Sequence, residues 1–346
     1  MNFAPLEALL DEIRMKRLPG CEMLVTVEGK KAFDYHSREN KRFIAYSLTK
    51  PLTCVLALKF MERGAFTLND KLSEYICEAA DPKVAEKLEN GSVSIRSAKR
   101  GILIRDLFTM SAGLSYDISG LKDETALEAA RGILMRPLLF DPGTRWEYSL
   151  CHDVLGALIE RISGTRLSTL MRREIFSPLD MSDSCFVSEI TDISLISPQY
   201  SAKTLKPAAP DLRFTPGSLY DSGGAGLVTT TRDYSAFCEA LISGNILSKA
   251  ALELMTLNHL NGQALKDFNW PQLKGYGYGL GVRTLIDKTA GGALSPLGEF
   301  GWGGISGAYS LMDAKNGVTA VFMAHSPGTD EAWLYPRLRD VLYSCL

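Results

Sequence analysis

Residues 43–64 read Phe-Ile-Ala-Tyr-Ser-Leu-Thr-Lys-Pro-Leu-Thr-Cys-Val-Leu-Ala-Leu-Lys-Phe-Met-Glu-Arg-Gly, and this stretch decides the fold. Its apolar approach ends at Ser47, and apolar residues then cover most of a helical circumference. That pattern predicts a buried helix from Ser47 to about Arg63. Pro51 is compatible with the first turn, where backbone N–H groups have no intrahelical partner, and Gly64 is typical of a position just past a helix end. We expect the rest of the chain to pack around this helix.

The first turn of this helix carries a hydroxyl and an amine. Ser47 and Lys50 are three residues apart, so their side chains share one face at the positive end of the helix dipole. The pair indicates a nucleophile and its activating base. The alternative is that Ser47 only caps the helix while Lys50 is solvated. Ser-x-x-Lys also arises by chance, and a second copy, Ser119 and Lys122, has the composition of a polar loop.

Composition excludes several classes of protein. The chain has 346 residues and a net charge of −2, which gives no reason to expect nucleic acid or an anionic membrane as a partner. Residues 1–20 are charged and contain no apolar signal-peptide core, and no run is long enough to span a membrane. The seven cysteines are scattered without a Cys-x-x-Cys pair, which favours reduced thiols and a cytoplasmic location.

The order of the predicted elements indicates an α+β fold. We expect an amphipathic helix at 4–17 and a hairpin formed by strands 23–27 and 32–35. From about 65 to 265 the patterns are mostly helical, including a helix capped by Thr231. Strands at 278–284, 299–312 and 318–324 and a final helix at 333–342 complete the chain. Strands at both ends predict one sheet domain from residues 1–64 and 266–346, with a mostly helical domain, 65–265, inserted between its parts.

Further motifs follow in the order of a known superfamily. They are Ser-Leu-Thr-Lys at 47–50, Leu-Phe-Thr-Met-Ser-Ala-Gly-Leu at 107–114, Pro-Gly-Thr through Tyr-Ser-Leu at 142–150, Ser-Gly-Gly-Ala-Gly-Leu at 222–227, and Trp-Gly-Gly at 302–304. With these motifs the chain resembles the serine β-lactamase and penicillin-binding-protein superfamily, nearest its class C and family VIII carboxylesterase branch. The resemblance covers nearly the whole chain. It implies a β-lactamase/transpeptidase-like fold, with an antiparallel sheet flanked by helices and an inserted helical domain.

The resemblance also makes Tyr148 a catalytic candidate beside Ser47 and Lys50. Lysine and tyrosine side chains both have reference pKa values near ~10, so a base of either kind at neutral pH needs a strongly perturbed environment. Burial favours a neutral amine, whereas a nearby cation favours a phenolate, and two groups in contact titrate as a pair. We therefore assign the base role to the pair and leave open which member accepts the proton. Spacing alone would indicate only a half-buried aromatic residue beside a turn for Tyr148.

The tetrahedral intermediate that leads to an acyl-enzyme needs hydrogen-bond donors for its oxyanion. The N–H of Ser47 lies at a helix N-terminus, and the resemblance places the second donor on the N–H of Ile305. Gly303 and Gly304 suit a close approach of that backbone to a substrate, although they could instead mark only a β-bulge.

Two departures from the superfamily pattern suggest the kind of substrate. Its lactamases and peptidases usually open the third motif with a lysine or histidine that binds the substrate carboxylate, where this chain has Trp302. They usually have asparagine as the third residue of the tyrosine motif, where this chain has Leu150. A charge-assisted grip on a carboxylate is therefore missing here. The resemblance to family VIII, which shares both residues, favours small esters, with Tyr116 as a further candidate for the pocket wall.

Other chemistries find no support in the sequence. No complete Gly-x-Ser-x-Gly motif is present, and the four histidines are dispersed without a zinc-binding motif, so we expect neither a metal nor a cofactor. The prediction is a serine hydrolase that cleaves short-chain carboxylic esters through an acyl-enzyme on Ser47. A β-lactamase or D-amino-acid peptidase, an acyltransferase, and a non-catalytic binder of acyl or peptidoglycan-like ligands are the alternatives. The expected partner is a small-molecule ester or lactam, and nothing in the sequence predicts the oligomeric state.

Overall fold

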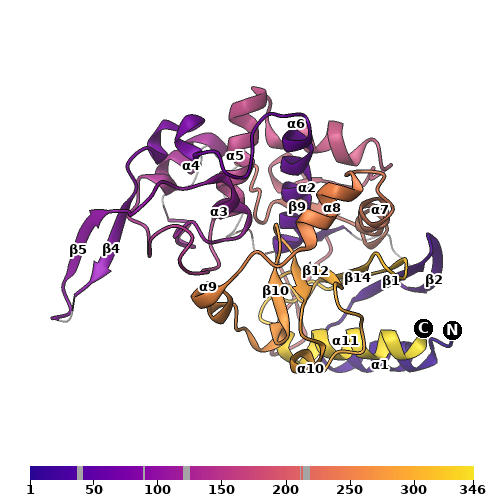
Figure 1. Cartoon of the computed structure of the whole chain (residues 1–346). Coiled ribbons are helices and arrows are strands. Elements are labelled where there is room, and N and C mark those ends of the chain that lie inside the picture. Colours follow the sequence, from indigo (N-terminus) through magenta and orange to yellow (C-terminus); the bar gives the residue numbers. More distant parts are fainter. Residues whose placement is uncertain (37–41, 89, 120–124, 211, 213–218) are drawn as a thin grey trace.

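The computed structural model describes residues 1–36, 42–88, 90–119, 125–210, 212 and 219–346. Its centre is a seven-stranded antiparallel sheet with the order β10-β11-β12-β13-β14-β1-β2 (Figure 1). These strands are β10 (Tyr276–Tyr278), β11 (Arg283–Leu285), β12 (Phe300–Gly303), β13 (Tyr309–Asp313), β14 (Val318–Met323), β1 (Glu22–Val27) and β2 (Lys30–Tyr35). Because β1 pairs with β14, the two ends of the chain form one sheet. The predicted α+β class with an antiparallel sheet flanked by helices is confirmed.

Helices cover both faces of this sheet, in agreement with the two-residue alternation of its strands. In β14, Ala320 and Phe322 point toward α1 (Ala4–Lys16) and α11 (Glu331–Cys345), while Val321 and Met323 point to the opposite face. That opposite face packs against α7 (Thr231–Ile242) and α2 (Thr49–Glu62). Figure 1 shows α1 and α11 together below the sheet and α2 above it.

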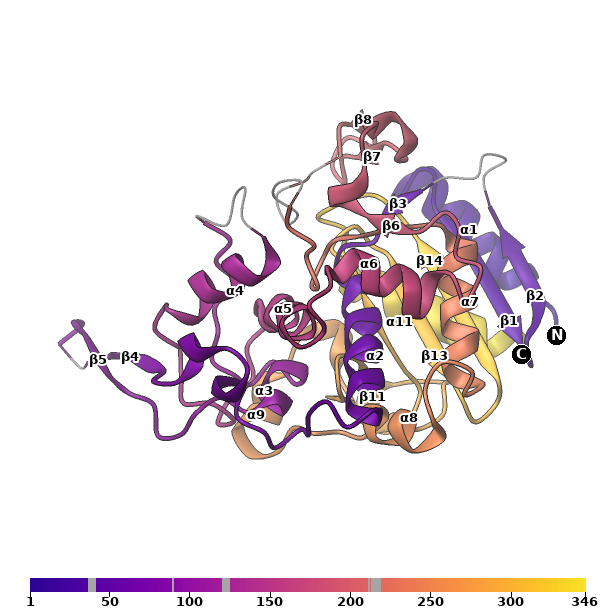
Figure 2. The ribbon, with the colours of Figure 1, turned by 90° about the horizontal axis from the view of Figure 1, so that it is seen from above.

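The long segment between β2 and β10 is mostly helical within the described residues. Figure 2 shows α5 beside α2 and α4 on the far side of α5, and α3 and α6 also pack on α5. The helices are α3 (Ile104–Phe108), α4 (Ala126–Leu134), α5 (Cys151–Ser163), α6 (Leu167–Met171) with a π-helical turn (Arg172–Phe176), α8 (Lys249–Thr256) and α9 (Gly262–Asp267), and α10 (Lys288–Gly291) follows β11. Short strands in this segment are β6 (Cys185–Phe186), β7 (Gln199–Tyr200), β8 (Pro207–Ala208) and β9 (Leu227–Thr229), and β9 also pairs with β3 (Phe43–Ile44).

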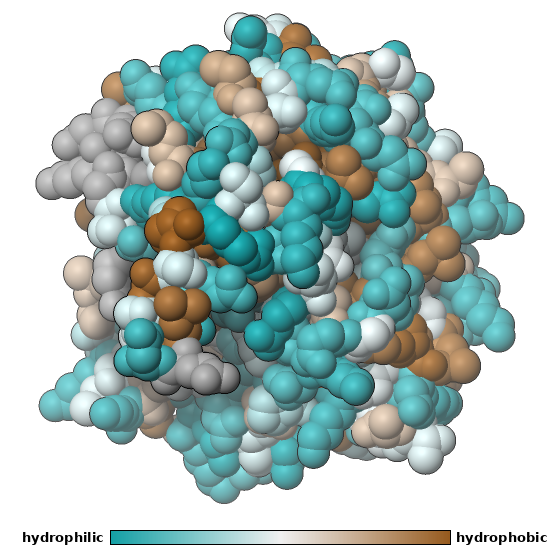
Figure 3. All heavy atoms as spheres, turned by 60° about the vertical axis from the view of Figure 1, so that its left-hand side comes forward, coloured by the Kyte–Doolittle hydropathy of each residue, from teal (hydrophilic) through white to brown (hydrophobic). Residues whose placement is uncertain are grey.

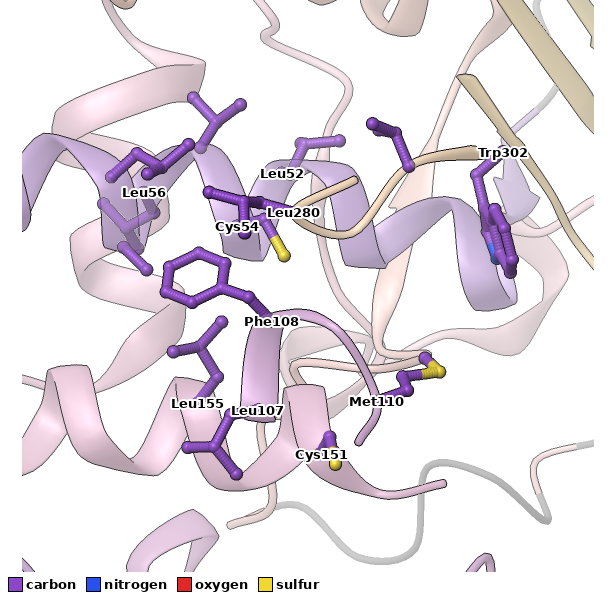
Figure 4. Packing of buried hydrophobic residues seen from close by; sticks show 14 of the residues in the cluster. Leu52, Cys54, Leu56, Leu107, Phe108, Met110, Cys151, Leu155, Leu280 and Trp302 are labelled. Carbon is purple, nitrogen blue, oxygen red and sulfur yellow. The ribbon is translucent and has the colours of Figure 1, made fainter. Parts of the chain in front are cut away.

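The predicted central helix is confirmed, with a short extension at its start. A 3₁₀ turn (Tyr46–Leu48) leads directly into α2, so Ser47 precedes the first α-helical residue by two positions. Every residue of α2 from Thr49 to Leu58 is buried, because the sheet, α5, α6 and α7 surround the helix. Figure 4 shows the apolar side chains that pack between α2 and two other helices, α3 with Phe108 and α5 with Cys151 and Leu155. The side chain of Trp302 also faces this cluster.

Several element predictions were wrong in detail. The predicted strand at 278–284 is two strands, because the chain turns at 279–281, where Gly281 has a φ of +82°. The predicted strand at 299–312 is likewise split into β12 and β13 by a turn after Gly303. Thr231 is the first residue of α7, and the cap is the hydroxyl of Thr230, which accepts from the Asp233 N–H.

A hairpin within the mostly helical segment was not predicted. Strands β4 (Lys83–Lys87) and β5 (Val93–Ser97) pair with each other and project from the body of the molecule (Figure 1). Val84 in β4 is buried in the core, but β4 does not alternate polar and apolar residues. β5 does alternate, but its apolar residues Val93 and Ile95 are exposed, so the sequence pattern of the hairpin is weak. Figure 3 views this side of the molecule, and hydrophilic residues cover most of it with hydrophobic ones scattered among them.

Two further observations concern the chain as a whole. All seven cysteines are free thiols, and five of them are buried. No helix of the described segments is both long and apolar enough to cross a bilayer.

Candidate active site

Ser47 lies at the entrance to α2, on the wall of a cavity of about 470 Å³. The residue before it, Tyr46, has a φ of +45°, a left-handed conformation that is strained for a side chain of this size. Tyr46 is held there because its phenol accepts from the amide of Gln199, while its carbonyl accepts from the Thr49 hydroxyl at 2.6 Å. Such a turn directs the next residue, Ser47, toward the cavity.

Lys50 is fully buried one turn after Ser47. Its Nζ donates to the Gly224 carbonyl at 2.8 Å and to Ser47 Oγ at 3.2 Å. Ser47 makes no side-chain cap to the helix. The alternative interpretation, with Ser47 as a cap and Lys50 in solvent, was therefore wrong. The second Ser-x-x-Lys copy cannot be compared, because Lys122 lies outside the described residues.

Tyr148 reaches Ser47 from the segment before α5. Its hydroxyl and Ser47 Oγ share a hydrogen bond of 2.5 Å. The ring is stacked between Tyr116, with centroids 5.4 Å apart, and Trp302, at 6.2 Å, and Lys50 Nζ lies 4.7 Å from its centroid. These contacts fix the phenol beside the serine, so the three groups that the sequence singled out meet at one oxygen.

A buried carboxylate lies next to the loop whose carbonyl binds Lys50. Asp153 in α5 accepts hydrogen bonds from Tyr220 at 2.8 Å and from Ser222 at 2.6 Å, and the Gly224 N–H points to it at 3.4 Å. A Cβ on Gly224 would lie 2.5 Å from a carboxylate oxygen of Asp153 and 3.5 Å from Lys50 Nζ. Sequence reasoning identified the tight passage at 223–226 but missed Asp153. Its place three residues after the tyrosine motif gave no distinctive signal.

The end of β12 brings a backbone edge close to Ser47. A Cβ on Gly304 would lie 2.8 Å from the Ala45 carbonyl oxygen and 3.8 Å from the Ser47 nitrogen, so only glycine allows this approach. The Ile305 N–H donates to no described backbone or side-chain acceptor. Tyr335 in α11 holds the same turn, with its hydroxyl 3.2 Å from the Gly304 carbonyl and 3.0 Å from that of Ala308. The turn is thus fixed while one N–H remains available to a ligand.

Aromatic side chains form most of the remaining cavity wall. Tyr116 and Trp302, both predicted as pocket residues, line it, as do Gly303, Gly304 and Ile305. Trp270 also lines it and was not predicted; its ring lies 5.1 Å from that of Tyr148.

The structure does not place Leu150 on this wall. Leu150 is buried in the apolar core at the start of α5, where its N–H donates to the Ser115 carbonyl.

The cavity has a polar end formed by residues that the sequence did not indicate. Glu331, the first residue of α11, accepts a hydrogen bond from the Gln272 amide at 2.9 Å. Burial raises the pKa of Glu331 to about 7. Arg283 also borders the cavity, but its guanidinium is paired with Glu299 at 2.8 Å, and both side chains are almost completely buried.

His152 and Cys151 take no part in the cavity. Both are buried in the first turn of α5, and burial lowers the pKa of His152 well below its usual range, so its ring is neutral. Burial raises the pKa of the Cys151 thiol to about 12, which keeps it unreactive at neutral pH. No group of three or more potential metal ligands occurs in the part of the chain that the structure describes.

Known proteins resemble this chain in sequence and in fold. A family model described as Beta-lactamase matches residues 6–343. Esterase EstB of Burkholderia gladioli is 26% identical over 392 residues, which cover 99% of this chain and 95% of EstB.

Two solved structures have the same fold. EstCE1, described as a hydrolase with promiscuous acyltransferase activity, superposes with a TM-score of 0.81 at 22% identity, covering 98% of this chain and 97% of EstCE1. The LovD6 mutant of simvastatin synthase from Aspergillus terreus superposes with a TM-score of 0.82 at 18% identity, covering 99% and 98% of the two chains.

Proposed function

This chain belongs to the β-lactamase family and is a hydrolytic enzyme of the serine hydrolase fold, and we propose that it cleaves short-chain carboxylic esters through an acyl-enzyme on Ser47. One observation carries the proposal. The hydroxyl of Tyr148 lies 2.5 Å and the amine of Lys50 3.2 Å from Ser47 Oγ, at the wall of a cavity large enough for a small ester.

The first half-reaction transfers the acyl group to the enzyme. Ser47 Oγ attacks the ester carbonyl carbon, and its proton passes to the Lys50–Tyr148 pair. The N–H groups of Ser47 and Ile305 donate to the oxyanion of the tetrahedral intermediate. The C–O bond to the leaving alcohol then breaks, and the alcohol departs with the proton that the pair returns.

The second half-reaction releases the acid. A water molecule gives a proton to the same pair and attacks the acyl carbon, and Ser47 Oγ leaves and takes the proton back. Lys50 keeps its own position throughout, because the Gly224 carbonyl accepts one of its protons. The pair therefore acts as base and then as acid in each half.

The cavity wall favours esters over β-lactams and D-alanyl peptides. Those substrates carry a carboxylate that the third motif of their enzymes usually binds with a cation, and here Trp302 stacks on Tyr148 at that place. Trp270 and Tyr116 extend the aromatic wall, which suits an uncharged acyl or alcohol group. The esterase activity in the name of EstB, a relative over the full chain, supports the same choice.

The test is a substrate screen with the wild type and Ser47→Ala. We expect the wild type to turn over p-nitrophenyl acetate and butyrate, and the variant to lose at least ~10³-fold in kcat/KM. Labelling with a fluorophosphonate should modify the peptide that contains Ser47. Equal ester turnover by both proteins would contradict the proposal. No adduct on that peptide would also contradict it and would favour a non-catalytic binder. A far larger kcat/KM for a β-lactam or a D-alanyl peptide than for every ester would favour the lactamase or peptidase alternative.

Acyl transfer to an alcohol is the second candidate. The same acyl-enzyme would serve. EstCE1 and LovD, which share the fold, are described as a hydrolase with promiscuous acyltransferase activity and as a simvastatin synthase. Adding 1-butanol to the p-nitrophenyl butyrate assay and measuring the ratio of butyl butyrate to butyrate separates the two. A hydrolase yields mainly butyrate at millimolar alcohol, whereas a transferase yields mainly the ester.

A further inference from the structure

Glu331 occupies the side of the cavity that α11 and the 3₁₀ turn Pro271–Leu273 form. Gln272 in that turn donates to its carboxylate at 2.9 Å, and the side chain is only partly exposed. Tyr335, one turn further along α11, packs so closely on β12 that a Cβ on Gly303 would lie 2.7 Å from its ring. The start of α11 is thereby fixed against the strand that lies next to Ser47, and the carboxylate belongs to the same cavity as the nucleophile.

Within the part of the chain that the structure describes, no free cation balances this carboxylate. No described lysine or arginine forms an ion pair with Glu331. Arg283 borders the same cavity, but it binds Glu299, donates to the Ser310 carbonyl at 3.1 Å and stacks 4.4 Å from the Tyr309 ring centroid. Lys50 is fully buried and bonded to the Gly224 carbonyl. The cavity therefore presents an aromatic wall and one uncompensated carboxylate to a substrate.

We propose that Glu331 and Gln272 form a specificity subsite that repels carboxylates and binds a hydrogen-bond donor, a protonated amine or a hydroxyl, at the end of the substrate remote from the reacting carbonyl. The inference rests on the proposed function in so far as the ligand is an ester. It adds the substrate class: esters whose distal group is cationic or hydroxylated. An anionic end meets a like charge in a confined, partly apolar space, where charge interactions are stronger than in water.

Burial raises the pKa of Glu331 to about 7, and the hydrogen bond from Gln272 opposes that rise. The carboxylate is therefore mostly ionised at pH 8, which is the condition for the test. The other ionisable side chains that line the same cavity are Arg283, already paired with Glu299, and tyrosines.

Binding of ligands that contain no ester bond tests the subsite without catalysis. The probes are 6-amino-1-hexanol, 1,6-hexanediol and 6-hydroxyhexanoate, which differ only in the charge of one end. Their affinities at pH 8 can be followed by tryptophan fluorescence, because Trp270 and Trp302 line the cavity. We expect affinity to fall in that order, by ~10-fold between successive probes. Glu331→Gln should bring the three values within about 3-fold, and Glu331→Lys should reverse the order.

Glu253→Lys is the matched control, since it makes the same change of charge on an exposed residue of α8 that lines a separate groove. It should leave the order of the three probes unchanged. If Glu331→Lys leaves the order unchanged too, or if Glu253→Lys reverses it, the subsite proposal is overturned. Thermal unfolding of each variant shows that it is folded. Glu331→Gln tests the order of the probes without placing a cation at the start of α11.

Hydrolysis separates this proposal from the proposed function. The p-nitrophenyl esters of hexanoate and of adipate, the latter a monoester with a free carboxylate, give an anionic-to-neutral ratio of kcat/KM. That ratio should rise ~10–100-fold in Glu331→Lys. Turnover of neither of these esters nor of p-nitrophenyl butyrate would refute the proposed function, while the binding order would still decide the subsite. Turnover with a ratio that does not change would refute the subsite alone.

Discussion

The phenol oxygen of Tyr148 lies 2.5 Å from Ser47 Oγ, although 101 residues separate the two in the sequence. The tyrosine ring stacks on the rings of Tyr116 and Trp302, so its position does not depend on this hydrogen bond alone. Tyr148→Phe should therefore keep the fold and remove only the hydroxyl. If that hydroxyl moves the proton of Ser47, kcat for p-nitrophenyl butyrate should fall ~10²–10⁴-fold with little change in melting temperature.

Tyr278→Phe offers a matched control for this loss of a hydroxyl. The Tyr278 ring packs 5.1 Å from Trp302, and its hydroxyl is buried with no hydrogen-bond partner among the described residues. Its removal should leave kcat within about 3-fold and leave the free energy of unfolding equal or slightly higher, because a buried polar group without a partner is lost. Comparable losses of kcat in both variants would show that the aromatic cluster, and not the Tyr148 hydroxyl, supports catalysis.

The Ile305 N–H can be removed without changing the side-chain environment of Ser47. Ile305→Pro deletes the N–H, and the preceding residue, Gly304, has the freedom that a residue before proline needs. We expect kcat to fall ~10²–10³-fold, the usual effect of losing one oxyanion donor. Ile305→Val keeps the N–H and should retain kcat within about 3-fold. If Ile305→Pro and Ile305→Val have the same kcat in a steady-state assay, the second oxyanion donor lies elsewhere.

Gly224 lies between Lys50 and Asp153. In Gly224→Ala the new Cβ would meet the Asp153 carboxylate at 2.5 Å, so the loop must shift and carry with it the carbonyl that binds Lys50. We expect kcat to fall at least ~10-fold, because misplacement of a catalytic group by a fraction of an ångström is costly. The measurement is kcat together with the rate of fluorophosphonate labelling at Ser47, which reports the nucleophile alone.

Gly132→Ala is the control for that substitution. Gly132 lies inside α4 with open space where its Cβ would be, so alanine should stabilise the protein by about 0.5–1 kcal/mol and leave kcat unchanged. A loss of labelling in Gly132→Ala, or normal labelling in Gly224→Ala, would argue against a positioning role for the 224 loop.

How well the sequence predicted each site residue depended on how far apart in the chain the interacting residues lie. Ser47 and Lys50 were accessible from the sequence because one helical turn joins them. Tyr148 and Ile305 were accessible only through a resemblance to a family, and membership of the β-lactamase family is confirmed over residues 6–343. Their approach to Ser47 depends on sheet pairing and aromatic stacking between segments that are far apart in the chain.

Asp153 and Glu331 could not be predicted, for the same physical reason. A carboxylate in the first turn of a helix reads in the sequence as a favourable interaction with the helix dipole. Only the packing of α5 against residues 220–224, and of α11 against β12, turns these two carboxylates toward the site. Leu150 is the opposite case. Its place in the tyrosine motif predicted a pocket residue, but its side chain is buried in the core.

The stability of the protein at acid pH depends on His325, which is hydrogen-bonded through Gln199 to Tyr46 in the strained turn before Ser47. Its Nδ1 lies 2.8 Å from the Ser197 carbonyl, which can only accept, so Nδ1 carries the proton and Nε2 accepts from the Gln199 amide at 3.1 Å. The same amide donates to the phenol of Tyr46. Burial lowers the pKa of His325 to about 4, and protonation of Nε2 would place two donors against each other.

The sign of the resulting pH dependence follows from that pKa. Between pH 4 and 6.5 the unfolded chain binds the proton that the folded His325 refuses, so acid favours unfolding by up to about 3 kcal/mol over this range. His325→Asn can still donate to the Ser197 carbonyl but cannot gain a proton. Burial raises the pKa values of Glu160 and Glu331 to about 7, so these two groups make the folded state more stable as the pH falls. This effect is the same in the wild type and in His325→Asn, and it cancels when their unfolding free energies are subtracted. Urea unfolding at pH 4, 5 and 6.5 should therefore show the wild type losing more stability than His325→Asn as the pH falls. A constant offset between the two proteins at all three pH values would mean that His325 does not titrate in this range.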